Sequence, residues 1–318
     1  MNSIANTYIN LDETHFTLQA VDDYFIPCHR WAAEQIHRDE QCNQYQNQSV
    51  RGIVQIAHGM GEHSLRYRHI AESLVAAGYI VYANEHRGHG QQALSRGELG
   101  DFGPQGFPAL VNDMATLTYY VKEFHPNLPI ILLGHSMGSF AVQRYLIEFA
   151  GLLDGVVLSG TTAVDLLGTA VLEGFRLEEM NSALPDVRTP FDWLSRDPFQ
   201  VDQYISDPLC GFTVTDDSMT SIFTDCAVLA EPATLKQIPV NLPMYLFTGD
   251  HDPVNNHLQW FHPLLDRYWE AGLQDVSYHI FGGARHETLN EINREEVVAV
   301  LLCWLQRVIN DWHTRPRQ

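Results

Sequence analysis

The sequence has few cysteines, and their arrangement excludes two kinds of site. Five cysteines occur among 318 residues, an odd number, and no pair shows Cys-x-x-Cys spacing. They are Cys28, Cys42, Cys210, Cys226 and Cys303. This scatter argues against a disulfide framework and against a zinc site. We expect free thiols in a reducing environment, and therefore a cytoplasmic protein.

Basic residues and long apolar runs are also scarce. Lys and Arg together number 19 against 39 Asp and Glu, which gives a formal net charge of -20. That charge repels phosphate backbones, so nucleic acid is not an expected partner. No apolar run reaches the roughly 20 residues of a membrane-spanning helix, and residues 1–11 lack the basic start and apolar core of an export signal. The sequence therefore predicts no integral membrane segment.

What the chain does contain is a regular alternation of short apolar runs and amphipathic segments. Hydrophobic residues make up 45% of it, enough for one large domain with a substantial core. Two runs of alternating character predict an antiparallel pair of strands at a sheet edge. These are residues 14–20 and 24–31, and further strands are expected at 52–57, 79–83, 129–133, 154–159, 242–248 and 276–281. Helices are expected at 65–78, 107–124 and 140–149, from residue 254 to about 272, and across 297–312.

Strands that alternate with helices predict an α/β fold with a mostly parallel sheet covered on both faces. The alternation is interrupted once, where residues 160–241 show helical pieces and loops. We predict a core of residues 1–160 and 241–318 and an inserted helical cap, or lid, of residues 161–240, called the insertion below. Parallel sheets place their sites at the carboxyl ends of the strands, where this insertion is expected. The polar stretch 33–51 predicts an exposed connection.

The sequence Gly134-His135-Ser136-Met137-Gly138 lies between the predicted strand 129–133 and the predicted helix 140–149. A Gly-x-Ser-x-Gly sequence alone is common, but in a strand-turn-helix context it is typical of a strained turn that exposes a nucleophilic serine. The two glycines remove side chains that would collide as the chain reverses. Ser136 is therefore the candidate nucleophile.

Two further loops after predicted strands supply the partners that a serine nucleophile needs. A neutral hydroxyl requires an imidazole to take its proton, and that imidazole requires a carboxylate to orient it. His286 follows the strand 276–281, and Asp252 follows the strand 242–248. Asp250 is the rival carboxylate in the same turn. The order Ser136, Asp252, His286 is that of the α/β hydrolases.

Acyl transfer also needs two backbone N–H groups aimed at the developing oxyanion. One usually follows the nucleophile, and the other lies in a loop after an early strand. Met137 and Met60 occupy these places. The glycines of His58-Gly59-Met60-Gly61 allow close approach to a substrate.

Most of the 16 histidines are explained without chemistry. His86 and His89 have the spacing of a metal pair but no third ligand, so a structural role is the better interpretation. His58 and His63 are expected to hold the predicted oxyanion loop in shape, and His135 to pack beside Ser136. We expect neither a metal nor an organic cofactor.

Together these motifs resemble the monoacylglycerol lipase and lysophospholipase-like group of serine α/β hydrolases. The resemblance rests on His58-Gly59-Met60-Gly61-Glu62-His63-Ser64 with Arg66-Tyr67, Arg87-Gly88-His89-Gly90, Gly134-His135-Ser136-Met137-Gly138, Gly249-Asp250-His251-Asp252 and His286. It implies the α/β-hydrolase fold and assigns the acid to Asp252 rather than Asp250. The chain departs from the pattern at Asn84-Glu85 and Gln91-Gln92, where relatives often carry Asp and a small residue.

The predicted function is hydrolysis of a carboxylic ester through an acyl-enzyme on Ser136. A monoacylglycerol or a lysophospholipid is the expected small-molecule or lipid substrate. The alternatives are a small-ester esterase or an aminopeptidase of the same fold, or a non-catalytic ligand-binding protein that keeps the fold. Acyl length, head group and oligomeric state stay open at this stage.

Overall fold

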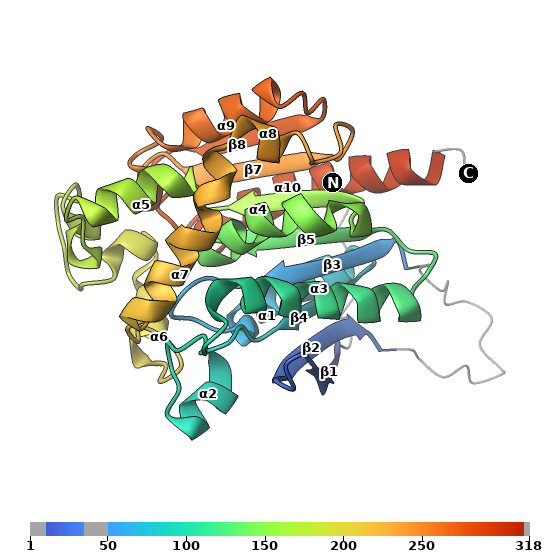
Figure 1. Ribbon diagram of the computed structural model, residues 1–318, viewed down its shortest axis with the longest axis horizontal. Coiled ribbons are helices and arrows are strands. Elements are labelled where there is room, and N and C mark those ends of the chain that lie inside the picture. Colours follow the sequence, from blue (N-terminus) through green and yellow to red (C-terminus); the bar gives the residue numbers. More distant parts are fainter. Residues whose placement is uncertain (1–10, 35–49, 315–318) are drawn as a thin grey trace, which may run out of the picture.

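The computed structural model describes residues 11–34 and 50–314, and these form an eight-stranded sheet (Figure 1). The strand order is β1-β2-β4-β3-β5-β6-β7-β8. The strands are β1 (Leu11–Gln19), β2 (Phe25–Ala33), β3 (Gly52–Ala57), β4 (Tyr79–Asn84), β5 (Ile130–His135), β6 (Gly155–Ser159), β7 (Met244–Gly249) and β8 (Val276–Phe281). β1 and β2 pair antiparallel at one edge, and β2 is antiparallel to β4. The other six strands, β3 to β8, run parallel to one another. This confirms the predicted edge pair and the mostly parallel sheet.

Helices cover both faces of this sheet. The helices of the core are α1 (Arg68–Ala76), α2 (Gly90–Arg96), α3 (Gly106–Phe124), α4 (Met137–Phe149), α9 (Phe261–Glu270) and α10 (Arg294–Thr314). Short 3-10 turns are η1 (Ser64–Tyr67), η2 (Ala150–Leu152), η6 (Pro253–Asn255) and η7 (Thr288–Asn290). α3, α4 and α9 pack on one face, and α1 and α10 pack on the other.

The alternation of side chains along the central strands builds these two cores. On β3, Val54 and Ile56 face α1 and α10, whereas Ile53 faces the helices of the opposite side. All six residues of β3 are buried, as expected for a central parallel strand. Gln55 is the polar exception, and its amide donates to the Met114 carbonyl on α3 while its Oε1 accepts from Thr118. The buried amide is therefore satisfied.

The insertion lies between β6 and β7, beyond the carboxyl ends of the strands at the left of Figure 1. It contains α5 (Val164–Leu172), η3 (Leu177–Asn181), η4 (Asp192–Leu194), α6 (Pro198–Ser206), α7 (Asp216–Cys226), η5 (Ala227–Ala230) and α8 (Pro232–Leu235). Two serines of α7, Ser218 and Ser221, accept backbone N–H bonds from Phe102 and Phe107. The buried side chains of the insertion join the core on the α3 and α4 side.

The structure differs from the predicted elements at two places. α2 was not predicted. The helix expected to follow residue 254 begins only at Phe261, because Asn256, His257 and Leu258 all have positive φ, which interrupts helical backbone. Much of the predicted connection 33–51, including Cys42, lies outside the described residues.

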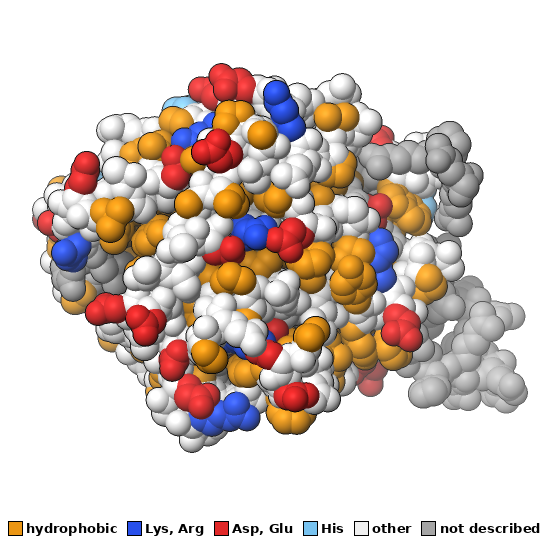
Figure 2. Space-filling view, viewed as in Figure 1, with side chains coloured by type: hydrophobic (Ala, Val, Ile, Leu, Met, Phe, Trp, Pro, Cys, Tyr) orange, Lys and Arg blue, Asp and Glu red, His pale blue; other side chains and the backbone are white. Residues whose placement is uncertain are grey.

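Figure 2 shows acidic side chains spread over the visible face of the molecule, in keeping with the net charge of -20. Among the described residues, no helix is both long and apolar enough to span a bilayer. The four described cysteines are free thiols: Cys28 and Cys226 are buried, Cys210 is half-buried and Cys303 is exposed.

Candidate active site

Ser136 occupies a strained turn between β5 and α4. Its φ of 51° and ψ of -125° lie in a region that costs a non-glycine residue about 1–3 kcal/mol. The flanking glycines allow the turn, because a Cβ at Gly134 would lie 2.5 Å from the Gly138 carbonyl oxygen, and a Cβ at Gly138 would overlap the Ala57 carbonyl. The side chain of Ser136 thus stands at the carboxyl end of β5, where α4 begins.

The structure brings Asp252 and His286 together from the ends of β7 and β8. His286 Nδ1 donates to Asp252 at 2.9 Å from Oδ1 and 3.0 Å from Oδ2, and both side chains are buried. Asp252 also accepts from Thr248 Oγ1 at 3.0 Å and from the Val254 N–H at 2.9 Å. The carboxylate is therefore fixed in place.

Asp250, the rival carboxylate, points elsewhere. It accepts from the Gly283 N–H and pairs with the exposed ring of His251, both at 2.7 Å. Of the two carboxylates in this turn, Asp252 is the one that contacts the candidate base.

His286 combines deep burial with a favourable charge partner. Burial alone would lower its pKa, but the charge of Asp252 and the hydrogen bond outweigh that effect, and the pKa of His286 lies above its ordinary value. Its Nε2 is buried and has no hydrogen-bond partner among the described residues. This leaves the second ring nitrogen available to a reacting group.

His286 lies beside His135, the residue that precedes Ser136, and its Nε2 makes no hydrogen bond to Ser136 in the described part of the chain. A Cβ at Gly160 would lie 3.0 Å from His286 Cε1, and the His135 ring is 4.8 Å from the His286 ring. From the insertion, the Trp193 ring lies 5.2 Å from the His286 ring, and the Trp193 carbonyl accepts the His286 N–H. The insertion covers this part of the site.

The predicted oxyanion loop, residues 58–64, lies directly against Ser136. A Cβ at Gly59 would be 3.2 Å from the Ser136 Cβ. The Gly59 N–H donates to Glu62 Oε1 at 2.5 Å, and the Gly61 N–H donates to His89 Nε2 at 3.3 Å. Met137, the first residue of α4, has an N–H without a partner inside the helix.

The histidines near this loop make hydrogen bonds within the protein. His58 Nδ1 donates to the Gly59 carbonyl, and its Nε2 accepts the His86 N–H. His63 Nε2 donates to Asp207 of the insertion. His135 Nδ1 lies 3.2 Å from Ser159 Oγ. Burial, and to a smaller extent the nearby His286 ring, lowers the pKa of His135 to about 4. These rings are hydrogen-bonded parts of the framework.

Glu85, at one of the departures from the family pattern, takes part in the same framework. It accepts from Ser64 Oγ at 2.5 Å and from His29 Nε2 at 3.2 Å. Burial would raise its pKa, but hydrogen bonds and nearby imidazoles hold the pKa of Glu85 at about 2. The longer side chain thus fixes the start of η1 beneath the oxyanion loop.

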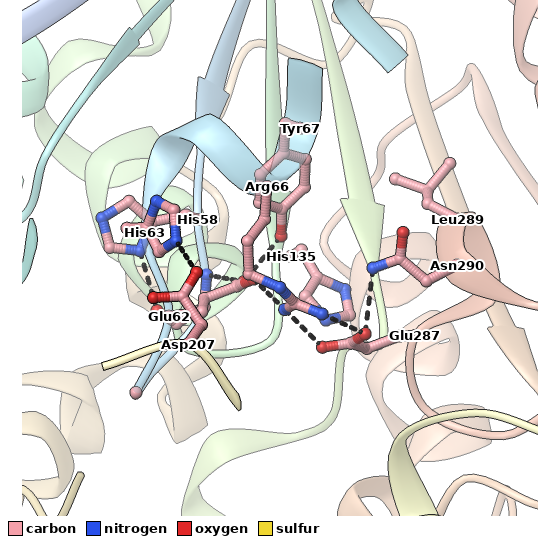
Figure 3. Close-up of polar contacts among 12 residues, drawn as sticks. His58, Glu62, His63, Arg66, Tyr67, His135, Asp207, Glu287, Leu289 and Asn290 are labelled. Atoms are coloured by element: carbon pink, nitrogen blue, oxygen red, sulfur yellow. Dashed lines mark hydrogen bonds and ion pairs between the residues drawn. The ribbon is translucent and has the colours of Figure 1, made fainter. Parts of the chain in front are cut away.

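A buried ion-pair network links the oxyanion loop to the loop that carries His286 (Figure 3). Arg66 NH1 donates to Glu62 Oε2 at 2.5 Å and to Glu287 Oε1 at 2.7 Å, and NH2 donates to Glu287 Oε2 at 2.8 Å. Tyr67 OH donates to Glu62, and Asn290 Nδ2 donates to Glu287. We had not predicted this network, because Arg66 and Glu287 are 221 residues apart.

The charges of the network depend on one another. Burial alone would raise the pKa of Glu287, but Arg66 holds it at about 2, below the ordinary 4.5. Arg66 lowers the pKa of Glu62 against burial in the same way. A folded-state pKa below the unfolded one contributes stability above about pH 4.5, and this contribution is lost as the pH falls toward 2.

Comparison with known proteins places the chain among hydrolases. The family model described as serine aminopeptidase, S33, matches residues 48–293. A monoacylglycerol lipase of Mycolicibacterium smegmatis is 31% identical over 261 residues, which cover 80% of this chain and 88% of that protein. A human monoglyceride lipase is 32% identical over 163 residues, 50% of this chain and 52% of that protein.

A solved structure extends the likeness to the whole fold. The thermostable carboxyl esterase from Bacillus coagulans, in complex with glycerol, matches with a TM-score of 0.79 and 28% identity. The match covers 93% of this chain and 99% of the esterase. The strand order and the helices on both faces are those of the α/β-hydrolase fold.

Removing Arg66 tests the network. Arg66→Met leaves two buried carboxylates without a counter-charge, and we expect the free energy of unfolding at pH 7 to fall by about 3–5 kcal/mol. The matched control is Arg307→Met, because the side chains of Arg307 and its partner Asp275 are 41% and 33% exposed, and such a surface pair is worth about 0–1 kcal/mol. Urea unfolding measures both, and equal losses would contradict the assigned role.

Proposed function

The chain belongs to the hydrolase family described as serine aminopeptidase, S33, and we propose that Ser136, Asp252 and His286 form its catalytic triad. It is a carboxylic ester hydrolase of the monoacylglycerol lipase type. The observation that carries the proposal is the buried Asp252–His286 pair at the strand ends beside the Ser136 turn.

The proposed reaction uses each ring nitrogen of His286 for a separate task. Nδ1 holds its proton against Asp252, so Nε2 is free to accept the proton of the Ser136 hydroxyl. The serine oxygen then attacks the ester carbonyl carbon, and the carbonyl electrons move onto the oxygen. His286 returns the proton to the leaving alcohol, and a water molecule later releases the acid by the same route.

The negative charge on the carbonyl oxygen needs donors that are already in place. We assign them to the N–H groups of Met60 and Met137. Met137 begins α4, whose N-terminus favours an anion. Glu62 fixes the Gly59 N–H, and therefore restrains the loop just before Met60.

The insertion is proposed to act as a lid. Trp193 packs on His286, and Nε2 is buried, so substrate entry requires part of the insertion to move. Closure excludes water, which strengthens the electrostatic stabilisation of the oxyanion.

A neutral lipid ester is the substrate class that the charges favour. The net charge of -20 disfavours an anionic head group, and therefore supports a monoacylglycerol over an anionic lysophospholipid. An aminopeptidase needs a free carboxylate for the substrate ammonium group, whereas Glu62 and Glu287 are both bound by Arg66. This supports ester cleavage over amide cleavage.

Replacing the two carboxylates of the β7 turn in parallel tests the proposed acid. Asp252→Asn should lower kcat by roughly 10⁴-fold, whereas Asp250→Asn should have a mild effect. The wild-type rate should fall as the pH drops through the raised pKa of His286, because the protonated ring cannot act as a base. In Asp252→Asn the pKa of His286 should be lower, so the fall of the residual activity with decreasing pH should occur at a lower pH than in the wild type. The opposite ranking of the two variants would transfer the role to Asp250.

A substrate series tests the proposed function itself. We expect monoacylglycerols to be cleaved faster than lysophospholipids and aminoacyl anilides. Each buried methylene contributes about 0.8 kcal/mol, so four added carbons should raise kcat/KM on the order of a hundredfold while the acyl site has room. Measuring kcat/KM for acyl chains of two to twelve carbons checks this, with Ser136→Ala as the blank. A flat profile, or faster cleavage of the anilides, would reject a lipid substrate.

A further inference from the structure

Three side chains with metal-binding atoms meet where the insertion rests on the oxyanion loop. His63 is the next-to-last residue of that loop, and Asp207 and Cys210 follow α6. One ligand atom from each residue lies within 4.8 Å of the other two. The sequence had suggested no metal site, because His63 and Asp207 are 144 residues apart and no local spacing links them.

Hydrogen bonds already connect the turn 207–211 to the oxyanion loop. The Gly211 N–H donates to the Gly61 carbonyl at 2.9 Å, and His63 Nε2 donates to Asp207 Oδ2 at 2.9 Å (Figure 3). The Leu209 N–H donates to Asp207 Oδ1 at 2.8 Å, which orients the carboxylate. The turn 207–211 is therefore held on the loop before any ion binds.

The spacing suits a tetrahedral ion. With bonds of about 2.0–2.1 Å to nitrogen or oxygen and about 2.3 Å to sulfur, tetrahedral ligand atoms are about 3.3–3.7 Å apart. The His63–Asp207 separation of 2.9 Å is shorter than this and the 4.8 Å limit is longer, so small side-chain rotations bring all three atoms to bonding distance. The proton that His63 now shares with Asp207 stands where the ion would bind.

We propose that His63, Asp207 and Cys210 bind one divalent transition-metal ion of the zinc type, with a water molecule as the fourth ligand. Imidazole, carboxylate and thiolate together are ligands that Zn²⁺ accepts, whereas Mg²⁺ and Ca²⁺ prefer oxygen alone. The site lies outside the proposed triad and goes beyond ester hydrolysis.

The local charge and access both favour a cation. Glu62 and Glu287 already offset the charge of Arg66 beside the site, so Asp207 leaves the region negative. A surface cavity of about 650 Å³ is lined by His63 and Asp207 and gives a path for the ion.

Metal binding at this site would change the protonation of two of its ligands. The Cys210 thiol releases one proton when its sulfur binds the metal, and the ring proton of His63 moves from Nε2 to Nδ1. Nδ1 is buried and has no hydrogen-bond partner within the described residues, so no existing bond has to break there. Binding therefore strengthens as the pH rises.

An ion in this position would tie the insertion to the loop that carries Met60. His63 directly follows Glu62, which holds the Gly59 N–H. Occupancy thus opposes any movement of the turn 207–211 away from the oxyanion loop, and it stabilises the folded chain by mass action.

Cobalt titration of the full-length protein tests the site without relying on activity. Co²⁺ bound to a thiolate in tetrahedral geometry gives a near-ultraviolet charge-transfer band and strong visible bands. We expect one Co²⁺ per chain and displacement of the bands by Zn²⁺. Cys210→Ser should abolish the charge-transfer band, and Asp207→Ala should weaken binding by at least about tenfold. The control Cys303→Ser, an exposed thiol on α10, should behave as wild type.

Absence of the band in the wild type, or a band that survives in Cys210→Ser, would overturn the proposal. If that variant does not fold, alkylation of the wild type with iodoacetamide gives an independent answer. Zn²⁺ should slow the modification of Cys210, read by peptide mass spectrometry, and leave the rate at Cys303 unchanged. Equal rates at Cys210 with and without Zn²⁺ would contradict the site.

Discussion

The geometry of the site depends on the two ion pairs that the Arg66 guanidinium makes with Glu62 and Glu287. The guanidinium binds Glu62 in the oxyanion loop and Glu287 beside His286, and all three side chains are almost fully buried. Buried charges are tolerated only when they are paired, so these two loops cannot separate without exposing or stranding a charge. The network therefore fixes the distance between the proposed oxyanion donors and the proposed base, although it touches neither Ser136 nor the substrate.

The remaining geometry comes from the sheet. β5, β7 and β8 are parallel, so their carboxyl ends bring Ser136, Asp252 and His286 to one edge from positions far apart in the chain. The insertion then covers that edge, with Trp193 on His286 and the turn 207–211 on the oxyanion loop. In this account different parts of the molecule serve catalysis and access: the strand ends hold the proposed triad, and the mostly helical insertion that covers it is the proposed lid.

The features that could be predicted from the sequence are those that depend on residues close together in the chain. The Ser136 turn was predictable because two glycines at fixed spacing report a steric need that arises within five residues. The strands were predictable from apolar runs, and the choice of Asp252 over Asp250 required family resemblance because both lie in one turn. Three features were not predictable, since each depends on contacts or backbone strain that no sequence spacing encodes. They are the Arg66–Glu287 pair, the His63–Asp207 contact and the late start of α9 after the positive-φ residues 256–258.

The central claim is that Ser136 is the nucleophile of an ester hydrolase. Reaction of the protein with a fluorophosphonate, followed by peptide mass spectrometry, tests it most directly, because only a serine activated by a base and an oxyanion hole attacks phosphorus rapidly. The account predicts a single adduct on Ser136, absent in Ser136→Ala, with folding unchanged. An adduct on Ser139 or on another serine, or no adduct on a folded and ester-cleaving protein, would contradict it.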